Sequence, residues 1–229
     1  MQKINALITG STGMVGKSVL LSCLDNPNIE SVLILNRTAI GIKHEKLKEI
    51  ILTDFYDLSS VKSELKGYNA CFYCLGVSSS VVSGDEYKKI TYDMTMHFAE
   101  TLTQLNDDLT FCYVSGIGTD TKEKSKMNWA NVKGKVENDL LAISKMKTYL
   151  IRLGMLYPAV GIRSKTKSFD IMYRLLRPLL YLYKIILPKG IITSENFGQA
   201  LINTSLYGYE KKYLWNKDLN KLAKREINE

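Results

Sequence analysis

The sequence has few of the residues on which metal sites and disulfides depend. Only two histidines and four cysteines occur among 229 residues. His44 and His97 are far apart and have no neighbouring cysteines or carboxylate pairs, so we expect no metal site. Cys71 and Cys74 have the C-x-x-C spacing of zinc and redox sites, but they lie in an apolar, strand-like run where residues three apart point to opposite faces. We interpret all four cysteines as buried structural residues.

Long hydrophobic runs are also missing. No apolar stretch reaches the ~20 residues that a membrane-spanning helix needs, and the longest candidate, Pro178 to Pro188, is shorter and contains Lys184. Polar Gln2 and Lys3 lead directly into a strand-like segment, so we expect no secretory leader. Together these absences predict a cytoplasmic protein.

Acidic residues are scarce in one part of the chain. The formal net charge is +8, and between Thr121 and Gly190 there are 15 lysines and arginines but only 4 acidic residues. A surface of this kind attracts phosphates, acidic substrates, nucleic acid or anionic lipid. We interpret it as a solvated basic face and expect no specific nucleic-acid partner, because no nucleic-acid motif accompanies the charge.

Strand-like and helix-like segments alternate along the chain, which predicts one α/β domain with a parallel sheet between helices. The expected strands are Lys3–Thr9, Glu30–Asn36, Glu49–Leu52, Asn69–Leu75, Leu109–Val114 and Thr148–Leu153. The expected helices are Met14–Asp25, Leu58–Lys66, Gly84 or Asp85 to Leu105 with Asp85 as its cap, and Met127–Lys145. Residues 154–229 are expected to be a small helical part of the same domain that covers the substrate crevice, with helices at Phe169–Ile186, Ser194–Leu206 and from Lys217.

The most informative stretch joins the first strand to the first helix. Gly10, Gly13 and Gly16 follow the strand at intervals of three residues. Gly10 permits a tight turn, Gly13 lets a pyrophosphate approach the backbone, and Gly16 lets the helix pack closely on the strand. The helix N-terminus offers free N–H groups to an anion. The stretch therefore predicts a dinucleotide site, with a tight turn that binds no ligand as the alternative; its residues are Gly10, Ser11, Thr12, Gly13, Met14, Val15 and Gly16.

The G-x-x-G-x-x-G spacing resembles the short-chain dehydrogenase/reductase superfamily, in its extended and atypical branches. Residues 133–137, Lys-Gly-Lys-Val-Glu, resemble the helix of the small atypical reductases, which include the Tat-interacting tumour-suppressor type and bacterial nucleoside-diphosphate-sugar-epimerase-like proteins. The resemblance covers Ile4 to about Pro158. It implies a doubly wound (Rossmann) parallel sheet with strand order 3-2-1-4-5-6, and NAD(P)-dependent hydride transfer to a small carbonyl or nucleotide-sugar-like substrate.

The end of the second expected strand bears on the choice of cofactor. NAD-preferring sites carry an Asp or Glu there, whereas this chain has Asn36-Arg37-Thr38 and no carboxylate until Glu45. Arg37 offers a fork of donors that matches a 2′-phosphate. We therefore expect NADP(H) to be preferred and keep NAD(H) as the alternative.

Three further cofactor contacts are implied by the resemblance. Asp54 and Phe55 match the position that reads adenine, with a turn or cap role as the alternative for Asp54. Residues 75–77, which are Leu75, Gly76 and Val77, match the loop whose backbone approaches the ribose and nicotinamide. Residues 152–158, including Leu156, resemble the segment whose backbone touches the carboxamide, although Leu153 stands where the family usually has proline.

Members of the superfamily place a serine after the fifth strand, then a tyrosine and a lysine four residues apart on the next helix. By this resemblance, Ser115 would face the substrate and Lys133 would hold the nicotinamide ribose. Trp129 stands at the tyrosine position. Its indole N–H cannot be deprotonated near neutral pH, so Trp129 is expected to line the nicotinamide pocket without exchanging protons.

Three hypotheses remain open. We favour an unusual oxidoreductase or epimerase-like enzyme whose proton comes from Ser115, from a tyrosine such as Tyr157 or from water, or whose acceptor is a flavin that needs none. The second is a non-catalytic NADP(H)-binding regulatory or scaffold protein. The third is a peripheral membrane protein that uses the basic, apolar segment Arg163–Lys189, although Pro178 divides this segment and favours a lid or a dimer contact. By analogy with the superfamily, the protein could form a homodimer.

Overall fold

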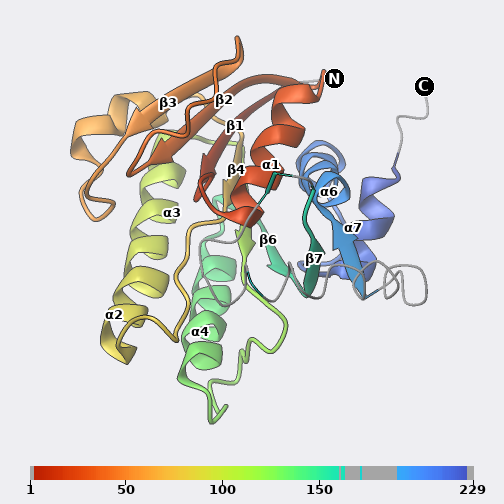
Figure 1. Ribbon diagram of the computed structural model, residues 1–229. Coiled ribbons are helices and arrows are strands. Elements are labelled where there is room, and N and C mark those ends of the chain that lie inside the picture. The colour runs from red at the N-terminus through yellow and green to blue at the C-terminus, as the bar shows by residue number, and fades with distance from the viewer. Residues whose placement is uncertain (1–2, 160, 163–170, 172–189, 226–229) are drawn as a thin grey trace.

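A single seven-stranded sheet forms the centre of the protein. The computed structural model describes residues 3–159, 161–162, 171 and 190–225. All neighbouring strands of this sheet are parallel, and their order is β3-β2-β1-β4-β5-β6-β9 (Figure 1). The strands are β1 (Ile4–Thr9), β2 (Ile29–Asn36), β3 (Leu47–Ile51), β4 (Ala70–Tyr73), β5 (Leu109–Val114), β6 (Met146–Arg152) and β9 (Tyr213–Trp215).

The expected doubly wound sheet and its order 3-2-1-4-5-6 are confirmed, and β9 extends it at the edge. The chain runs outward from β1 through β2 and β3 on one side and through β4, β5 and β6 on the other. The strand order therefore reverses between β1 and β4. In open parallel sheets, ligands bind in the crevice at such a switch point, outside the carboxyl ends of the strands.

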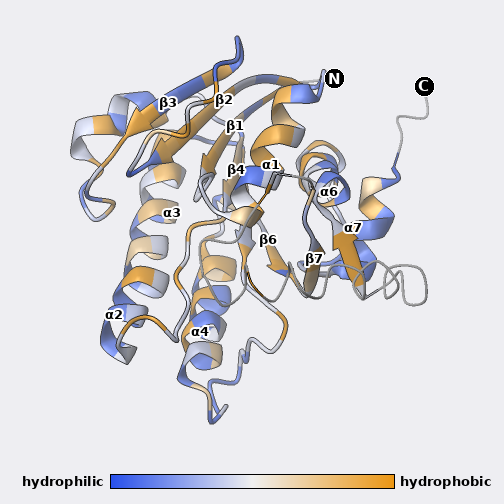
Figure 2. Cartoon of the chain, in the orientation of Figure 1, coloured by the Kyte–Doolittle hydropathy of each residue, from blue (hydrophilic) through white to orange (hydrophobic). Residues whose placement is uncertain are grey.

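Helices cover both faces of the sheet because its strands are apolar on both sides. One core cluster joins the sheet to α1 (Met14–Asp25), α6 (Ser194–Tyr207) and α7 (Asn216–Ala223). The other joins it to α3 (Met94–Leu105) and α4 (Asn128–Ala142). Figure 2 shows β1 and β2 as mainly hydrophobic and α2 (Gly84–Lys88) as mainly hydrophilic.

The helix expected between residues 84 and 105 consists of three pieces. A single π-helical stretch, η2 (Lys89–Asp93), separates α2 from α3. The N-cap of α2 is Ser83 rather than the expected Asp85, because the Ser83 hydroxyl accepts a hydrogen bond from the Glu86 backbone N–H at 3.2 Å. Asp85 lies in the first turn, where its charge favours the positive end of the helix dipole. The expected helix at Leu58–Lys66 is the 3-10 helix η1 (Ser59–Leu65).

The described part of residues 154–229 differs from the expected helical cover. Two short strands, β7 (Met155–Tyr157) and β8 (Ile191–Thr193), pair in a separate sheet. Helix α6 packs against α1, and its Phe197 and Leu201 are fully buried in the core. This burial places α6 on a face of the main sheet rather than over the crevice. The expected helix Phe169–Ile186 and the segment Arg163–Lys189 lie outside the described residues, apart from Ile171. Within the described residues, no helix combines the length and apolarity that a membrane crossing requires.

Candidate functional site

Two of the three glycines between β1 and α1 are required by the protein's own packing. Gly10 has a φ of +68°, and a Cβ there would lie 2.6 Å from the Cys74 carbonyl oxygen. A Cβ at Gly16 would lie 2.3 Å from the Gly10 carbonyl oxygen. Both approaches are far below van der Waals contact with backbone atoms, so these positions hold the turn closely against β4 and α1.

The middle glycine has no comparable explanation within the chain. A Cβ at Gly13 would meet only the Gly10 carbonyl oxygen, at 3.3 Å, and a Cβ at Gly76 would meet no protein atom within 4 Å. Gly13 is also the N-cap of α1 and provides no side chain for the helix N–H groups. The turn thus leaves backbone N–H groups and an open approach at the switch point of the sheet. This arrangement fits the phosphates of a dinucleotide.

The loop after β4 lies beside this turn, as the resemblance implies. The Leu75 backbone N–H donates to the Thr9 hydroxyl at 3.3 Å. Leu75 and Val77 are half-buried and Gly76 is exposed. The carboxyl end of β1 and the loop after β4 therefore lie side by side at the switch point of the sheet.

The end of β2 carries a hydrogen-bonded chain that links the glycine turn to β3. The Ser11 hydroxyl donates to the buried Asn36 side-chain oxygen at 2.8 Å, and the Asn36 side-chain N–H donates to Glu49 Oε1 at 2.8 Å. The Ile40 backbone N–H donates to the same carboxylate oxygen at 3.0 Å. A carboxylate therefore does reach the end of β2, although none follows β2 closely in sequence. It comes from β3, which is the neighbouring strand in the sheet.

Three residues expected near the adenosine differ in exposure. Arg37 is exposed directly beyond β2. Asp54 is exposed too, and its carboxylate accepts the Tyr56 backbone N–H at 2.8 Å, which is the local turn role kept as the alternative. Phe55 is 4% exposed and belongs to the core.

The carboxyl end of β5 brings Ser115 and Lys133 together, as the resemblance implies. The Lys133 ammonium donates to the Ser115 carbonyl oxygen at 3.1 Å. Burial lowers the pKa of Lys133 to about 8, and the nearby Glu137 carboxylate acts in the opposite direction. The Ser115 hydroxyl does not point to open solvent but donates to Glu137 Oε1 at 2.6 Å. Its hydrogen is therefore engaged, and its lone pairs remain for other partners.

Glu137 is the centre of a buried ion pair that sequence reasoning missed. Its side chain is fully buried, and the Arg152 guanidinium donates to both of its oxygens, at 3.2 Å from Nε and 2.6 Å from Nη2. The guanidinium carbon lies 4.8 Å from the Tyr213 ring centroid and 5.7 Å from that of Trp215. Aromatic faces at these distances attract the cation. One available signal was the spacing of Glu137 four residues after Lys133 on α4, which places both on one helix face.

Trp129 is half-buried in the first turn of α4. A Cβ at Gly118 would lie 3.2 Å from its indole ring, so the indole packs on the loop between β5 and α4. Tyr157 is half-buried on β7, whereas the Leu156 side chain is 1% exposed and belongs to the core. Leu156, which is expected among the cofactor contacts, is thus buried in the core.

Three of the four cysteines are buried and Cys74 is half-buried, which is typical of structural residues. Cys71 packs in the core cluster of α3 and α4, whereas Cys74 packs against the cluster of α1 and α6. The two side chains therefore lie on opposite faces of the sheet, as predicted. Burial also raises the pKa of the Cys112 thiol to about 12. In the part of the chain that the structure describes, no three His, Cys, Asp or Glu side chains group as metal ligands.

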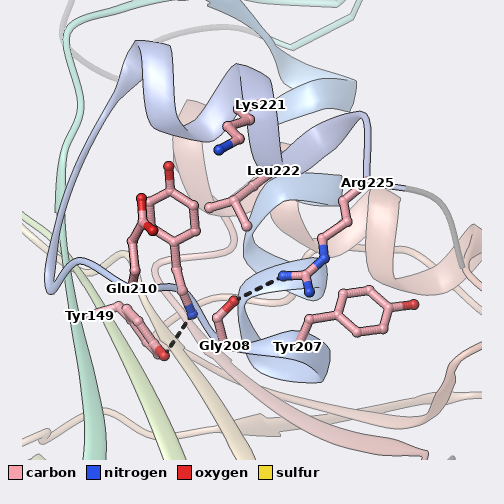
Figure 3. Close-up of a pocket in the computed structure, with 8 residues that line it drawn as sticks. Tyr149, Tyr207, Gly208, Glu210, Lys221, Leu222 and Arg225 are labelled. Carbon is pink, nitrogen blue, oxygen red and sulfur yellow. Dashed lines mark hydrogen bonds between the residues drawn. The ribbon is translucent and has the colours of Figure 1, made fainter. Parts of the chain in front are cut away.

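Two surface hollows flank the last strands. One, of about 490 Å³, lies at the carboxyl ends of β6 and β9 and is lined by Ile117, Arg152 and Trp215 among others. The other, of about 730 Å³, lies between the ends of α6 and α7, where Tyr149, Tyr207 and Lys221 line it (Figure 3). Because these helices run back from the carboxyl ends of β8 and β9, the larger hollow lies at the end of the sheet opposite the glycine turn. The smaller hollow and the glycine turn thus share the carboxyl end of the sheet.

Comparisons with known proteins identify relatives among fungal mitochondrial proteins. No family model matches the chain. The protein named "Protein FMP52, mitochondrial" from Debaryomyces hansenii is 30% identical over 167 residues, which cover 72% of this chain and 71% of the relative. "Protein fmp52, mitochondrial" from Emericella nidulans is 24% identical over 209 residues, covering 88% and 87% of the two chains. The expectation of a cytoplasmic protein is contradicted by these relatives, which are named mitochondrial.

Solved structures with the same fold include epimerases and enzymes in complex with NAD, which agrees with the fold that the resemblance implies. A UDP-N-acetylglucosamine 4-epimerase from Methanobrevibacter ruminantium has a TM-score of 0.70 at 14% identity, covering 94% of this chain and 76% of that one. The Helicobacter pylori ADP-L-glycero-D-manno-heptose-6-epimerase has a TM-score of 0.69 at 16% identity, with coverage of 93% and 76%. The Bordetella bronchiseptica enzyme WbmF in complex with NAD+ has a TM-score of 0.66 at 14% identity, with coverage of 96% and 77%.

Proposed function

The chain belongs to the FMP52 family, and from this premise we propose that it is a mitochondrial NAD(P)(H)-binding oxidoreductase that transfers hydride to a carbonyl compound. The observation that carries the proposal is the glycine turn. Gly10 and Gly16 are fixed by contact with the protein's own backbone, whereas Gly13 faces an open approach at the N-terminus of α1. The solved structures that share this fold include enzymes in complex with NAD+.

A bound dinucleotide would supply the hydride for a carbonyl carbon. The chain must then supply the proton that the carbonyl oxygen takes up. Trp129 cannot release one near neutral pH. The hydroxyl hydrogen of Ser115 is held by Glu137, which leaves this hydroxyl as a hydrogen-bond acceptor.

Lys133 is the group that combines a positive charge with a mobile proton at this site. Its ammonium has three N–H bonds, and one is directed at the Ser115 carbonyl oxygen. Its pKa, lowered to about 8 by burial, brings proton release close to neutral pH. In the proposed reaction the carbonyl carbon gains hydride, the oxygen gains the Lys133 proton, and the neutral amine recovers a proton from water.

We further propose that NADP(H) is preferred. Arg37 is exposed beyond β2, where its guanidinium would reach a 2′-phosphate. Glu49 lies near the same strand end, but its Oε1 oxygen already accepts two N–H groups of the protein. Part of its charge is thereby compensated, and a moderate rather than absolute preference is expected.

A second candidate function is dinucleotide binding without turnover. Two observations favour it: Trp129 replaces the usual acid, and the Ser115 hydrogen is engaged by a buried carboxylate. In this case the protein would report the redox state of the nucleotide pool to a partner. Carbonyl reduction by the unmodified protein separates the two functions, because only the oxidoreductase turns over. If the binding protein lacks nothing but the acid, Trp129→Tyr starts carbonyl reduction; if its substrate pocket has also diverged, activity stays absent while dinucleotide binding is retained.

The proposal is tested by titrating the purified protein with NADPH and with NADH. The indole of Trp129 packs on the loop between β5 and α4, beside the proposed nicotinamide end, and its fluorescence should be quenched on binding. A Trp129→Phe variant should lose most of that quenching and keep the affinity. The fluorescence of NADPH itself gives a second, independent signal. Absence of binding by both nucleotides would overturn the proposed function.

A further inference from the structure

The smaller hollow lies directly beside the proposed catalytic groups. Its volume is about 490 Å³, and its walls come from the loop after β5 and from the carboxyl ends of β6 and β9. Ile117 follows Ser115 by two residues, and its backbone N–H donates to the Leu153 carbonyl oxygen at 3.1 Å. Arg152, which also lines the hollow, is paired with the carboxylate that holds the Ser115 hydroxyl. A molecule in this hollow would thus lie next to the reacting groups.

The polar side chains that line the hollow are largely used by the protein itself. The Asn216 side-chain oxygen accepts the Gly154 backbone N–H at 3.0 Å, and its two N–H bonds go to the Met155 and Gly190 carbonyl oxygens at 2.9 Å each. The Arg152 Nε and Nη2 atoms bind Glu137. These groups stabilise the walls and offer little hydrogen bonding to a ligand.

The remaining surface is apolar with one cation at its rim. Ile117 is 66% exposed, although it is a large aliphatic side chain. Trp215 is half-buried and is among the residues that form the wall. Lys217 is exposed and supplies the positive charge, whereas no carboxylate is among the described residues that line the hollow. Apolar walls with few polar groups are typical of sites for hydrophobic small molecules.

A sugar would be poorly served by this surface. Each hydroxyl that leaves water without a hydrogen-bond partner costs free energy. A flat conjugated ring, by contrast, gains from contact with an indole and an aliphatic side chain. The resemblance implies either a small carbonyl compound or a nucleotide-sugar-like substrate. The residues of the walls favour the carbonyl compound.

We propose that the substrate of this site is a flat, apolar carbonyl compound, such as an aryl aldehyde, aryl ketone or quinone, held between Trp215 and Ile117. An acidic substituent on the ring would lie near Lys217. This inference rests on the proposed function and names its substrate class. It excludes nucleotide sugars as the substrates of this chain.

The test uses 2-naphthaldehyde as the probe and UDP-glucose as the comparison. In a Trp129→Phe variant Trp215 is the remaining tryptophan, since the chain has two, and its fluorescence should be quenched by 2-naphthaldehyde but not by UDP-glucose. Ile117→Asp should weaken naphthaldehyde binding at least tenfold. The matched control is Ile51→Asp on β3, where an isoleucine that is 50% exposed lies far from the hollow. The affinity of this variant for 2-naphthaldehyde should equal that of the unmodified protein.

Equilibrium dialysis of 2-naphthaldehyde against the unmodified protein and Ile117→Asp gives the same comparison without the Trp129 substitution. The proposal is overturned if UDP-glucose binds more tightly than 2-naphthaldehyde, or if Ile117→Asp and Ile51→Asp behave alike. Dinucleotide affinity is measured on the same samples from NADPH fluorescence. Loss of that signal in the unmodified protein would sink the oxidoreductase proposal, whereas the naphthaldehyde arms report on the hollow alone.

Discussion

The two ends of the proposed site, one at the glycine turn and one at Glu137, are built in different ways. The dinucleotide end is a run of seven consecutive residues, Gly10 to Gly16, whose conformation follows from contacts with the adjacent strand and helix. The proposed catalytic end joins side chains from β5, α4, β6 and β9 through one buried carboxylate, Glu137. The first end depends on local backbone shape, and the second on long-range charge pairing. Substitutions of charged side chains should therefore lower the free energy of unfolding at the catalytic end and the nucleotide affinity at the dinucleotide end.

The largest effect is expected at the catalytic end, from Glu137→Ala. The variant leaves the Arg152 guanidinium partly buried without its carboxylate, and breaking a buried pair in this way costs about 3–5 kcal/mol of unfolding free energy. Urea denaturation measures the loss. Glu100→Ala on the exposed side of α3 is the control and should change stability little. A loss below about 1 kcal/mol, the usual value for exposed pairs, would show that the pair is not isolated from water.

At the dinucleotide end, substitution of Arg37 should change nucleotide affinity rather than stability. Arg37→Ala removes a charged contact worth about 1.5–3 kcal/mol, so NADPH affinity should fall roughly 10- to 150-fold. NADH affinity should be unchanged, because NADH has no 2′-phosphate. Lys43→Ala removes an exposed cation from the following loop and serves as the control. Equal losses for both nucleotides would remove Arg37 from the phosphate site.

The glycine turn itself offers a sharper test within one motif. Gly16→Ala forces a Cβ against the Gly10 carbonyl oxygen and should lower stability by about 1–3 kcal/mol, as overpacking does. Gly13→Ser keeps stability, since serine is a favoured N-cap, but its side chain blocks the phosphate approach. Thermal unfolding and NADPH titration separate the two outcomes. If Gly13→Ser binds NADPH as the parent protein does, the open face at Gly13 is not the phosphate site.

The last expected effect is a pH dependence of stability at Lys133, which is confined to alkaline pH. Burial lowers its pKa to about 8, below its ordinary value of 10.5. Between these values the unfolded chain holds more protons than the folded one, so this group makes stability rise with pH. Lys133→Met should lack the rise in denaturation midpoint between about pH 8 and about pH 10. Lys135→Met, whose parent side chain pairs with Asp139 at the surface, should retain it.

Much of the fold could be predicted from the sequence because it is locally encoded. The limits of α1 and β5 agree with expectation, since each is a continuous apolar pattern bounded by turn residues. The strands β7, β8 and β9 have only three residues each, too few to show a period. They form because partners distant in the chain complete them.

The difference between local patterns and contacts between distant parts of the chain also explains which residues of the candidate site could be named from the sequence. Ser115 and Lys133 were predictable because a family pattern names their positions. Glu49 was not, because it reaches Asn36 across the sheet rather than along the chain. Glu137 and Arg152 were likewise unassigned, since their pairing needs the register of α4 against β6. Sequence spacing predicts contacts within one helix or strand, but it does not predict contacts between two elements.

The position of β9 sets an order in time for the newly made chain. Tyr213 and Trp215 cover the Arg152 guanidinium, and they belong to the last strand of the sheet. The glycine turn precedes these rings along the chain and leaves the ribosome before them. Any nascent or truncated chain that stops before Tyr213 holds its Arg152–Glu137 pair uncovered. The corner around Arg152 is thus completed later than the glycine turn.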